Sequence, residues 1–217
     1  VAGCGTGQHS IETATRFKNS QILAIDLSLS SLSYAQRKTT ELKIDNITYI
    51  QADILDLLKI EKKFDIIESI GVLHHMNNPL DGWKVLTKLL KTNGLMKIGL
   101  YSELARTDIV NIREEISKLN IGSSENEIRN YRQSLIESKT KYGQNLQRFE
   151  DFFSLSMLRD LIFHVQEHRF TIEKIQESLS LLGLHFCGFE SKEIVNKFKL
   201  FYGENSDEFN LELWSNF

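Results

Sequence analysis

The chain has 217 residues, of which 41% are hydrophobic and 25% are charged, and its formal net charge is −3. This is the composition of an ordinary globular protein, and a single proline with twelve glycines excludes collagen-like or linker-rich character. No run of lysine or arginine forms the positive patch expected of a dedicated nucleic-acid-binding protein. The two cysteines, Cys4 and Cys187, are too few for a disulfide framework and fit a cytoplasmic protein. No apolar stretch reaches the ~18–20 residues that cross a membrane, so no membrane partner is expected.

Strand-like and helical patterns alternate over residues 1–101. Helices are predicted at residues 7–17, from an N-cap at Ser28, and at 80–91; strands are predicted at 21–25, 47–51, 64–68 and 95–101. The helix from Ser28 is expected to bury Leu32, Ala35 and Leu42. Asn93-Gly94 is expected to end the helix at 80–91, with the glycine in the left-handed conformation. The alternation predicts a Rossmann-like, doubly wound α/β fold with a mostly parallel sheet.

The rhythm changes after Tyr101. Residues 102–163 show helical patterns, at 109–119 and 125–136, and we interpret them as a helical insertion or lid after strand five. The core pattern returns with a helix at 171–182, ended by Gly183, and a strand at 184–190. We therefore expect a core of residues 1–101 and 164–190, an insertion of 102–163, and a C-terminal extension of 191–217 with one helix and a frayed end.

The opening loop contains three glycines at alternate positions, Gly3, Gly5 and Gly7. Such a loop between a strand and a helix lets a ligand approach the backbone closely. A dinucleotide fingerprint would need its third glycine at position 8, where Gln8 stands, and there is no P-loop lysine. The loop therefore predicts a nucleoside-type ligand, and the alternative is a tight turn with no ligand.

Acidic and polar residues follow the predicted strands. Asp26 can accept hydrogen bonds from two ribose hydroxyls, and Asp53 can accept one from an adenine amino group with Ile54 packed on the ring. Ser69 and Ile70 would complete the pocket. The alternative is that these residues only serve the turns, where Asp and Ser are common.

Together these stretches resemble the motif series of class I S-adenosylmethionine-dependent methyltransferases. The stretches are GCGTG (3–7), AIDLS (24–28), QADI (51–54), FDIIESIGVLHH (64–75) and LLKTNGL (89–95). The resemblance covers residues 1–101, returns at 171–190, and implies S-adenosylmethionine as cofactor. It implies the binding residues Gly3, Cys4, Gly5, Gly7, Asp26, Leu27, Asp53, Ile54, Ser69, Ile70 and His74. No metal is expected.

A narrower resemblance rests on LIFHVQEHRFT (161–171), which is similar to a segment of bacterial methyltransferases that carry tetratricopeptide repeats before the catalytic domain. It implies a tetratricopeptide-repeat region in the intact protein. Two features depart from the family: Val1 stands where an acid is usual, and no antiparallel seventh strand precedes Phe217. Truncation explains the missing strand but not Val1. Because the chain also starts directly at the glycine loop without a methionine, we expect a chain truncated at both ends.

Three residues are candidates for the substrate pocket: Tyr101, His164 and His168. The two histidines belong to the pattern H-x-x-E-H, which in zinc proteases places both on one helical face with the glutamate as base. No third metal ligand is identifiable, so packing between lid and core is the simpler interpretation. His74 and His75 are expected to form pocket wall and helix packing.

Methyl transfer from a sulfonium is an in-line displacement that depends mainly on alignment of the reacting groups. A base is needed only if the acceptor loses a proton, so the sequence assigns no catalytic residue. We expect methyl transfer to a small-molecule or protein acceptor that the 102–163 lobe selects. The alternative is a catalytically degenerate binding module of a repeat-containing scaffold protein.

Overall fold

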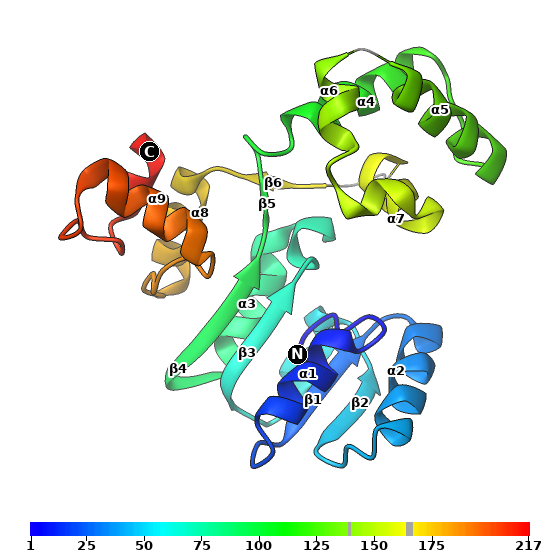
Figure 1. Cartoon of the computed structure of the whole chain (residues 1–217). Helices are drawn as coiled ribbons and strands as arrows, with labels where there is room; N and C mark the ends of the chain where they lie inside the picture. Colours follow the sequence, from blue (N-terminus) through cyan, green and yellow to red (C-terminus); the bar gives the residue numbers. More distant parts are fainter. Residues whose placement is uncertain (139, 164–166) are drawn as a thin grey trace. The chain divides into compact units, whose positions relative to one another are not determined.

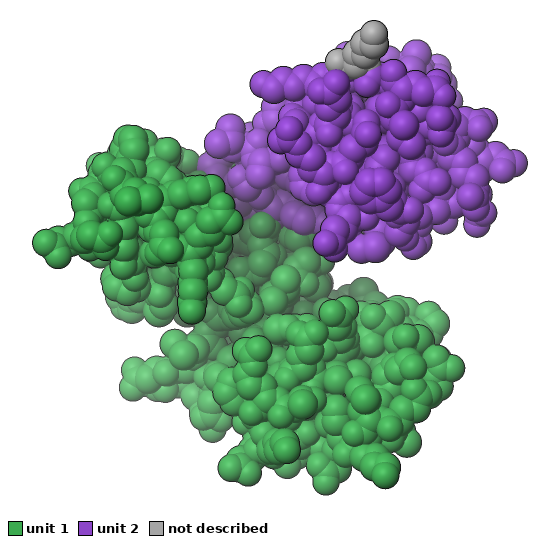
Figure 2. All heavy atoms as spheres, viewed as in Figure 1, with its two compact units in different colours: residues 1–100, 172–217 green, residues 101–171 purple. Residues whose placement is uncertain are grey.

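The computed structural model describes residues 1–138, 140–163 and 167–217, and it divides into two compact units (Figures 1 and 2). The core unit comprises Val1–Leu100 and Ile172–Phe217, and the inserted unit comprises Tyr101–Thr171. Within the described ranges, no helix combines the length and the apolar character needed to cross a bilayer.

The core unit alternates strands and helices before it ends in three consecutive helices (Figure 1). Its elements are α1 (Gln8–Arg16), β1 (Ile22–Asp26), α2 (Leu29–Glu41), β2 (Ile47–Gln51), η1 (Ile54–Lys59), β3 (Phe64–Ile70), η2 (Leu73–His75), α3 (Pro79–Leu89), β4 (Leu90–Gly99), α8 (Ile172–Leu182), α9 (Lys192–Tyr202) and α10 (Leu211–Asn216).

All strand pairs of the core unit are parallel. Strand β1 pairs with β2, and β3 pairs with β4. Ala2 joins the two pairs, because it forms a parallel bridge to Ile25 of β1 and its N–H donates to the Glu68 carbonyl of β3 at 2.8 Å. The order is therefore β2, β1, Ala2, β3, β4, which confirms the predicted Rossmann-like, mostly parallel sheet.

Helices cover both faces of this sheet. Ala2, Ile25 and Ile67 pack with Trp83 and Leu86 of α3, whereas Val1 and Ala24 pack with Leu32 of α2. Because successive residues of a strand point to opposite faces, α2 and α3 lie on opposite sides of the sheet. The sheet is therefore doubly wound, as the alternation of elements predicted.

Local capping explains where two of the helices begin. The Ser28 hydroxyl accepts a hydrogen bond from the Ser31 N–H at 3.2 Å, which confirms this residue as the N-cap of α2. Asn78 caps α3 in the same way, with Pro79 at its first position. The predicted apolar face of α2 is only partly right, because Leu32 and Ala35 are buried while Leu42 is 59% exposed.

The end of α3 differs from the prediction. The helix stops at Leu89, and Asn93 rather than Gly94 takes the left-handed conformation, with φ at 60°. Gly94 instead lets β3 and β4 come close together, since a Cβ there would lie 2.9 Å from the Asp65 carbonyl oxygen. This contact falls where the register of β3 against β4 shifts between Phe64 and Ile66.

The predicted strand at 184–190 is wrong, since the described structure has no strand in that segment. Gly183, with φ at 66°, ends α8 as predicted, but Gly188 has φ at 113°, which a regular strand does not contain. Phe186 and Phe189 pack against the C-terminal helices instead of joining the sheet. Burial of aromatic rings therefore outweighs the strand propensity of this stretch.

The predicted frayed end is also wrong. The chain after Ser191 forms the two helices α9 and α10, and the ring of Phe198 stacks on Trp214 with centroids 4.1 Å apart. Phe198 is fully buried and Trp214 is 6% exposed. The Trp214 indole N–H donates to the Glu208 carbonyl at 2.8 Å, so the polar edge of the ring is satisfied as well.

The inserted unit is mainly helical. Its elements are β5 (Tyr101–Ser102), α4 (Thr107–Lys118), α5 (Glu125–Glu137), α6 (Lys141–Leu146), η3 (Glu150–Phe153), α7 (Leu155–Phe163) and β6 (Arg169–Phe170). The helices predicted at 109–119 and 125–136 are confirmed, and they bury Ile112 and Ile128 in one apolar cluster. The parallel pair β5 and β6 was not predicted, because two-residue strands are too short to show a period.

The aromatic cluster of the C-terminal helices generates the first prediction. Phe198→Ala removes a fully buried ring and should lower the free energy of unfolding by about 3–5 kcal/mol. Phe201→Ala, on the same helix but 67% exposed, is the matched control and should cost about 0.5 kcal/mol. Urea denaturation followed by tryptophan fluorescence measures both, and equal effects would contradict the packing described.

Candidate functional site

The glycine loop of residues 3–7 lies between Ala2 and α1. Gly3 and Gly7 have φ values of 78° and 85°, which side chains rarely adopt. A Cβ at Gly3 would lie 2.1 Å from Val72 Cγ2, and one at Gly7 would lie 2.6 Å from Ala35 Cβ. Both positions therefore need glycine for conformation and for space.

Backbone hydrogen bonds fix the beginning of this loop on β1. The N–H groups of Gly3 and Cys4 both donate to the Ile25 carbonyl, at 2.9 Å each. The Gly7 N–H donates back to the Cys4 carbonyl at 2.9 Å, which closes the turn. The loop is thus held at the carboxyl end of β1, the edge at which open α/β sheets bind ligands.

Asp26, the last residue of β1, holds the middle of the loop. Its Oδ2 accepts from the Gly5 N–H at 2.7 Å, and its Oδ1 accepts from the Ser28 N–H at 2.9 Å. Each carboxylate oxygen has two lone-pair sites, so one site on each oxygen is left for a ligand hydroxyl. The next residue, Leu27, is 66% exposed and offers an apolar surface beside the carboxylate.

Asp53 and Ile54 follow β2 and differ in what they can offer a ligand. The Asp53 Oδ1 accepts from the Leu55 N–H at 2.9 Å, so this side chain caps η1. Ile54 is only 6% exposed and packs in the core cluster with Leu57. The predicted packing of Ile54 on a ring is therefore not supported, because its side chain is used in the core, whereas the neighbouring Leu55 is 49% exposed.

The end of β3 and the following turn lie beside the glycine loop. Ser69 is fully buried, and its hydroxyl has no hydrogen-bond partner among the described residues. Ile70 is exposed, and Val72 packs against Gly3. His74 is 1% exposed, and its ring centroid lies 4.3 Å from that of His75 in a T-shaped arrangement, so its side chain is buried beneath the turn and is not on its surface.

Cys4 lies in the loop but is a poor nucleophile. Burial, followed by the nearby Asp26 charge, raises the pKa of its thiol to about 11. The thiolate, which is the reactive form, is therefore scarce near neutral pH. Its contribution to the site is its backbone and its packing against Ala24.

Sequence reasoning missed one contact next to the loop. The His9 Nε2 atom, in the first turn of α1, lies 2.9 Å from the Glu68 Oε2 atom of β3. The two residues are far apart in the sequence, and neither belongs to the predicted site. Only their position beside a predicted loop and at the end of a predicted strand could have indicated them.

Of the three candidate pocket residues, the structure describes Tyr101 and His168, and both belong to the inserted unit. The Tyr101 ring lies over the Arg106 guanidinium, 3.9 Å from Cζ to the ring centroid. Burial raises the pKa of Tyr101, and the Arg106 charge opposes that shift, so the phenol stays neutral. His168 is half-buried directly before β6, and His164 lies outside the described residues.

Glu167 argues against the protease interpretation of H-x-x-E-H. Its side chain is 1% exposed and forms ion pairs with Arg106 and, at 3.0 Å, with Arg113. A carboxylate held by two guanidinium groups is a weak base. Within residues 1–138, 140–163 and 167–217, no three His, Cys, Asp or Glu side chains are grouped to hold a metal ion.

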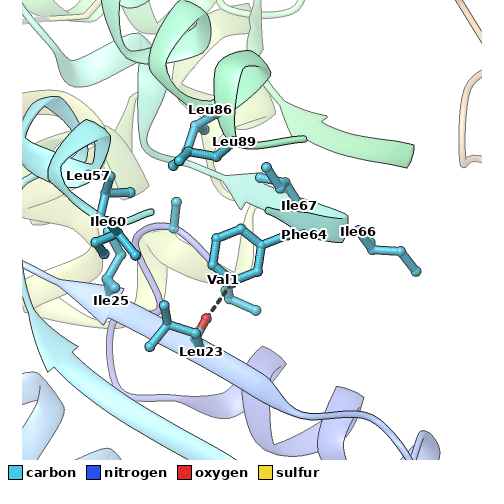
Figure 3. A pocket seen from close by; sticks show the side chains of 11 residues that line it. Val1, Leu23, Ile25, Leu57, Ile60, Phe64, Ile66, Ile67, Leu86 and Leu89 are labelled. Carbon is cyan, nitrogen blue, oxygen red and sulfur yellow. Dashed lines mark hydrogen bonds between the residues drawn. The ribbon is translucent and has the colours of Figure 1, made fainter. Parts of the chain in front are cut away.

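The core unit also contains an apolar cavity of about 40 Å³ (Figure 3). Side chains from the beginnings of the strands, such as Leu23 and Phe64, line it together with Leu57, Leu86 and Leu89. Ligand pockets typically measure about 300–1,000 Å³. The cavity is too small for a nucleoside and holds none of the residues predicted to bind one.

Comparison with known proteins gives a consistent picture. A family model described as "Methyltransferase domain" matches residues 2–153. An uncharacterised protein of Synechococcus sp. is 29% identical over 212 residues, which are 92% of this chain and 50% of that protein. The (S)-coclaurine N-methyltransferase of Papaver somniferum is 31% identical over 94 residues, or 43% of this chain and 26% of that enzyme. The chain thus spans half or less of the length of these curated relatives.

Two solved structures of one protein resemble nearly the whole chain. PKMT2 from Rickettsia typhi matches with a TM-score of 0.67 at 20% identity, covering 99% of this chain and 44% of that protein. The same protein in complex with AdoHcy gives a TM-score of 0.66 at 21% identity. This likeness shows that the two proteins share a fold.

The loop geometry generates a prediction on stability. Gly5→Ala should lower the free energy of unfolding by about 1–2 kcal/mol, because only the positive φ opposes the methyl group. Gly3→Ala should lower it by about 1–3 kcal/mol more, because the methyl group also meets Val72. Urea denaturation compares the two variants, and an equal loss would show that Val72 does not restrict the loop.

The ion pairs of Glu167 generate a prediction on pH. Burial alone would raise the Glu167 pKa, but the hydrogen bond and charge of Arg106 and the charge of Arg113 lower it overall. Since the folded pKa lies below the ordinary value of about 4.3, the stabilisation is present above that value and is lost as the pH falls through the folded pKa.

Glu167→Gln should therefore lower the free energy of unfolding near neutral pH by about 3–5 kcal/mol, because it leaves buried guanidinium charge uncompensated. It should also flatten the loss of stability below about pH 5. Denaturation curves at several pH values measure both effects. Glu114→Gln, a 60% exposed partner of Lys118, is the control and should change neither. If Glu167→Gln lost stability with falling pH as steeply as wild type does, Glu167 would not be the group that titrates.

Proposed function

Since the chain belongs to the methyltransferase domain family, we propose that it binds S-adenosylmethionine and transfers the methyl group to a small-molecule or protein acceptor. The observation that carries the proposal is the Asp26 carboxylate, which two backbone N–H groups hold against the glycine loop. The site thus places a fixed hydrogen-bond acceptor, the Asp26 carboxylate, beside a loop that has open space at Gly5.

The residues of the core unit fit this cofactor. The loop has open space where a Cβ at Gly5 would stand, and no described side chain caps the N-terminus of α1. Asp26 would accept the two ribose hydroxyls with the lone pairs that Gly5 and Ser28 leave open. Asp53 would accept the adenine amino group with the oxygen that does not cap η1.

S-adenosylmethionine supplies an electrophilic methyl group on a sulfonium centre, which a nucleophile displaces in line. The chain's part is to fix the orientation of the bound molecule and to exclude water, and in model reactions alignment is worth about 7–11 kcal/mol. None of the described side chains needs to act as a base for this role. Cys4 forms no covalent intermediate in the proposal, because its thiol stays protonated.

We assign selection of the acceptor to the inserted unit, with Tyr101 and His168 as its candidate pocket residues. The neutral phenol of Tyr101 and the half-buried imidazole of His168 are groups that can orient an acceptor by hydrogen bonds. We place the reaction in the cytoplasm, since Cys4 and Cys187 are free thiols. The association with tetratricopeptide repeats stays a prediction from residues 161–171.

Asp26 provides the direct test. Asp26→Ala should weaken the binding of S-adenosylmethionine by about tenfold or more, because each hydrogen bond to the charged group contributes about 1.5–3 kcal/mol. Asp26→Asn keeps one acceptor oxygen near the loop and should fall between Asp26→Ala and wild type. Isothermal titration calorimetry measures all three proteins. Asp45→Ala, which removes an exposed carboxylate before β2, is the control and should leave affinity unchanged.

Wild-type protein that does not bind S-adenosylmethionine would refute the proposed function. Production of S-adenosylhomocysteine over a panel of small-molecule and protein acceptors then distinguishes an enzyme from a binding module. Binding without any turnover across the panel would favour the module.

A further inference from the structure

One residue of β3 contacts the chain on both sides of the glycine loop. The backbone carbonyl of Glu68 accepts from the Ala2 N–H at 2.8 Å, directly before Gly3. The Glu68 carboxylate lies 2.9 Å from His9 Nε2, two residues after Gly7. Glu68 therefore anchors the entry of the loop with its main chain and the exit with its side chain.

The Glu68 carboxylate contacts the chain where the loop ends and α1 begins. Gly7 is the N-cap of α1, and no described side chain caps that end of the helix. The backbone bonds to Ile25 hold Gly3 and Cys4, Asp26 holds Gly5, and the Gly7 N–H donates to the Cys4 carbonyl, but none of these contacts uses a side chain of α1. The His9–Glu68 contact joins the first turn of α1 to β3, beside Ser10 of the same turn, which is fully buried.

The neighbouring charges leave this pair intact. Lys97 is the cross-strand partner of Glu68, but its ammonium pairs with Glu190 at 2.6 Å. Glu12, one turn beyond His9, accepts from Gln8 at 3.3 Å. The Glu68 side chain is 16% exposed and that of His9 is 38% exposed, so solvent screens the pair only in part.

We propose that His9 and Glu68 are positioning residues that hold the exit of the glycine loop in its ligand-binding conformation. Glycine loses more backbone freedom on ordering than any other residue, so a loop with three glycines is costly to fix at the moment of binding. A contact that orders the loop beforehand removes that cost from the binding step and raises affinity. The inference rests on the proposed function, because the ligand is S-adenosylmethionine.

A double-mutant cycle tests the proposal. His9→Ala and Glu68→Ala should each weaken S-adenosylmethionine binding by about three- to tenfold, and the double variant should be no weaker than either single variant. Glu68→Ala keeps the backbone carbonyl, so only the exit anchor is lost. Glu68→Gln retains an oxygen that accepts from His9 and should stay within about twofold of wild type. Isothermal titration calorimetry gives the four dissociation constants of the cycle and that of the Gln variant.

An ion pair that also involves β3 serves as the control. Lys91 and Asp65 pair at 2.8 Å at the beginning of β3, away from the glycine loop. Lys91→Ala, Asp65→Ala and their double variant should leave the affinity for S-adenosylmethionine unchanged. A similar loss in both cycles would mean that the effect comes from general destabilisation of the strand, and it would overturn the proposal.

Hydrogen exchange of the unliganded protein tests the same anchor without the cofactor. Amides of residues 3–10 should exchange faster in His9→Ala and Glu68→Ala than in wild type or in Asp65→Ala. Unchanged exchange in this segment, or strictly additive losses of affinity, would refute the positioning role. If wild-type protein fails to bind S-adenosylmethionine, the proposed function fails, and the exchange result still decides whether the anchor orders the loop.

Discussion

The insertion of Ala2 between β1 and β3 is the constraint on which the core unit depends. Without the bridge to Ile25 and the hydrogen bond to Glu68, the sheet would be two separate parallel pairs. The bridge brings the carboxyl ends of β1 and β3 to either side of the segment that leads into the glycine loop. Asp26, Ser69 and Gly3 therefore meet at one edge, although they come from distant parts of the sequence.

Polar contacts then fix the glycine loop in three places. Ile25 accepts from its first residues, Asp26 from Gly5, and Glu68 contacts His9 beyond its end. All three acceptors lie on β1 or β3, so the rigid sheet determines the shape of a segment that has little preference of its own. A site supported in this way is more precise than one built on loops alone.

Apolar packing explains the places where local patterns were misleading. Residues 184–190 have the composition of a strand, but Phe186 and Phe189 are needed to cover Trp214 and Phe198. Ile54, which follows Asp53, was predicted to pack on the adenine ring, yet its side chain packs in the core beside Leu57. In each case burial against residues remote in sequence outweighs the local preference, and no window of the sequence contains that information.

The sequence by itself determined the order of strands and helices in residues 1–101, the glycine loop and the acids at the strand ends. These features follow from local periodicity, from the unique backbone of glycine and from the direction of parallel strands. Only the tertiary structure decided that Asp26 is held by Gly5 and Ser28, that Ile54 and His74 are buried, and that His9 meets Glu68. The reason is physical: a hydrogen bond between distant residues depends on the register of the sheet and on how helices pack on it, and neither is written in a single stretch of the chain.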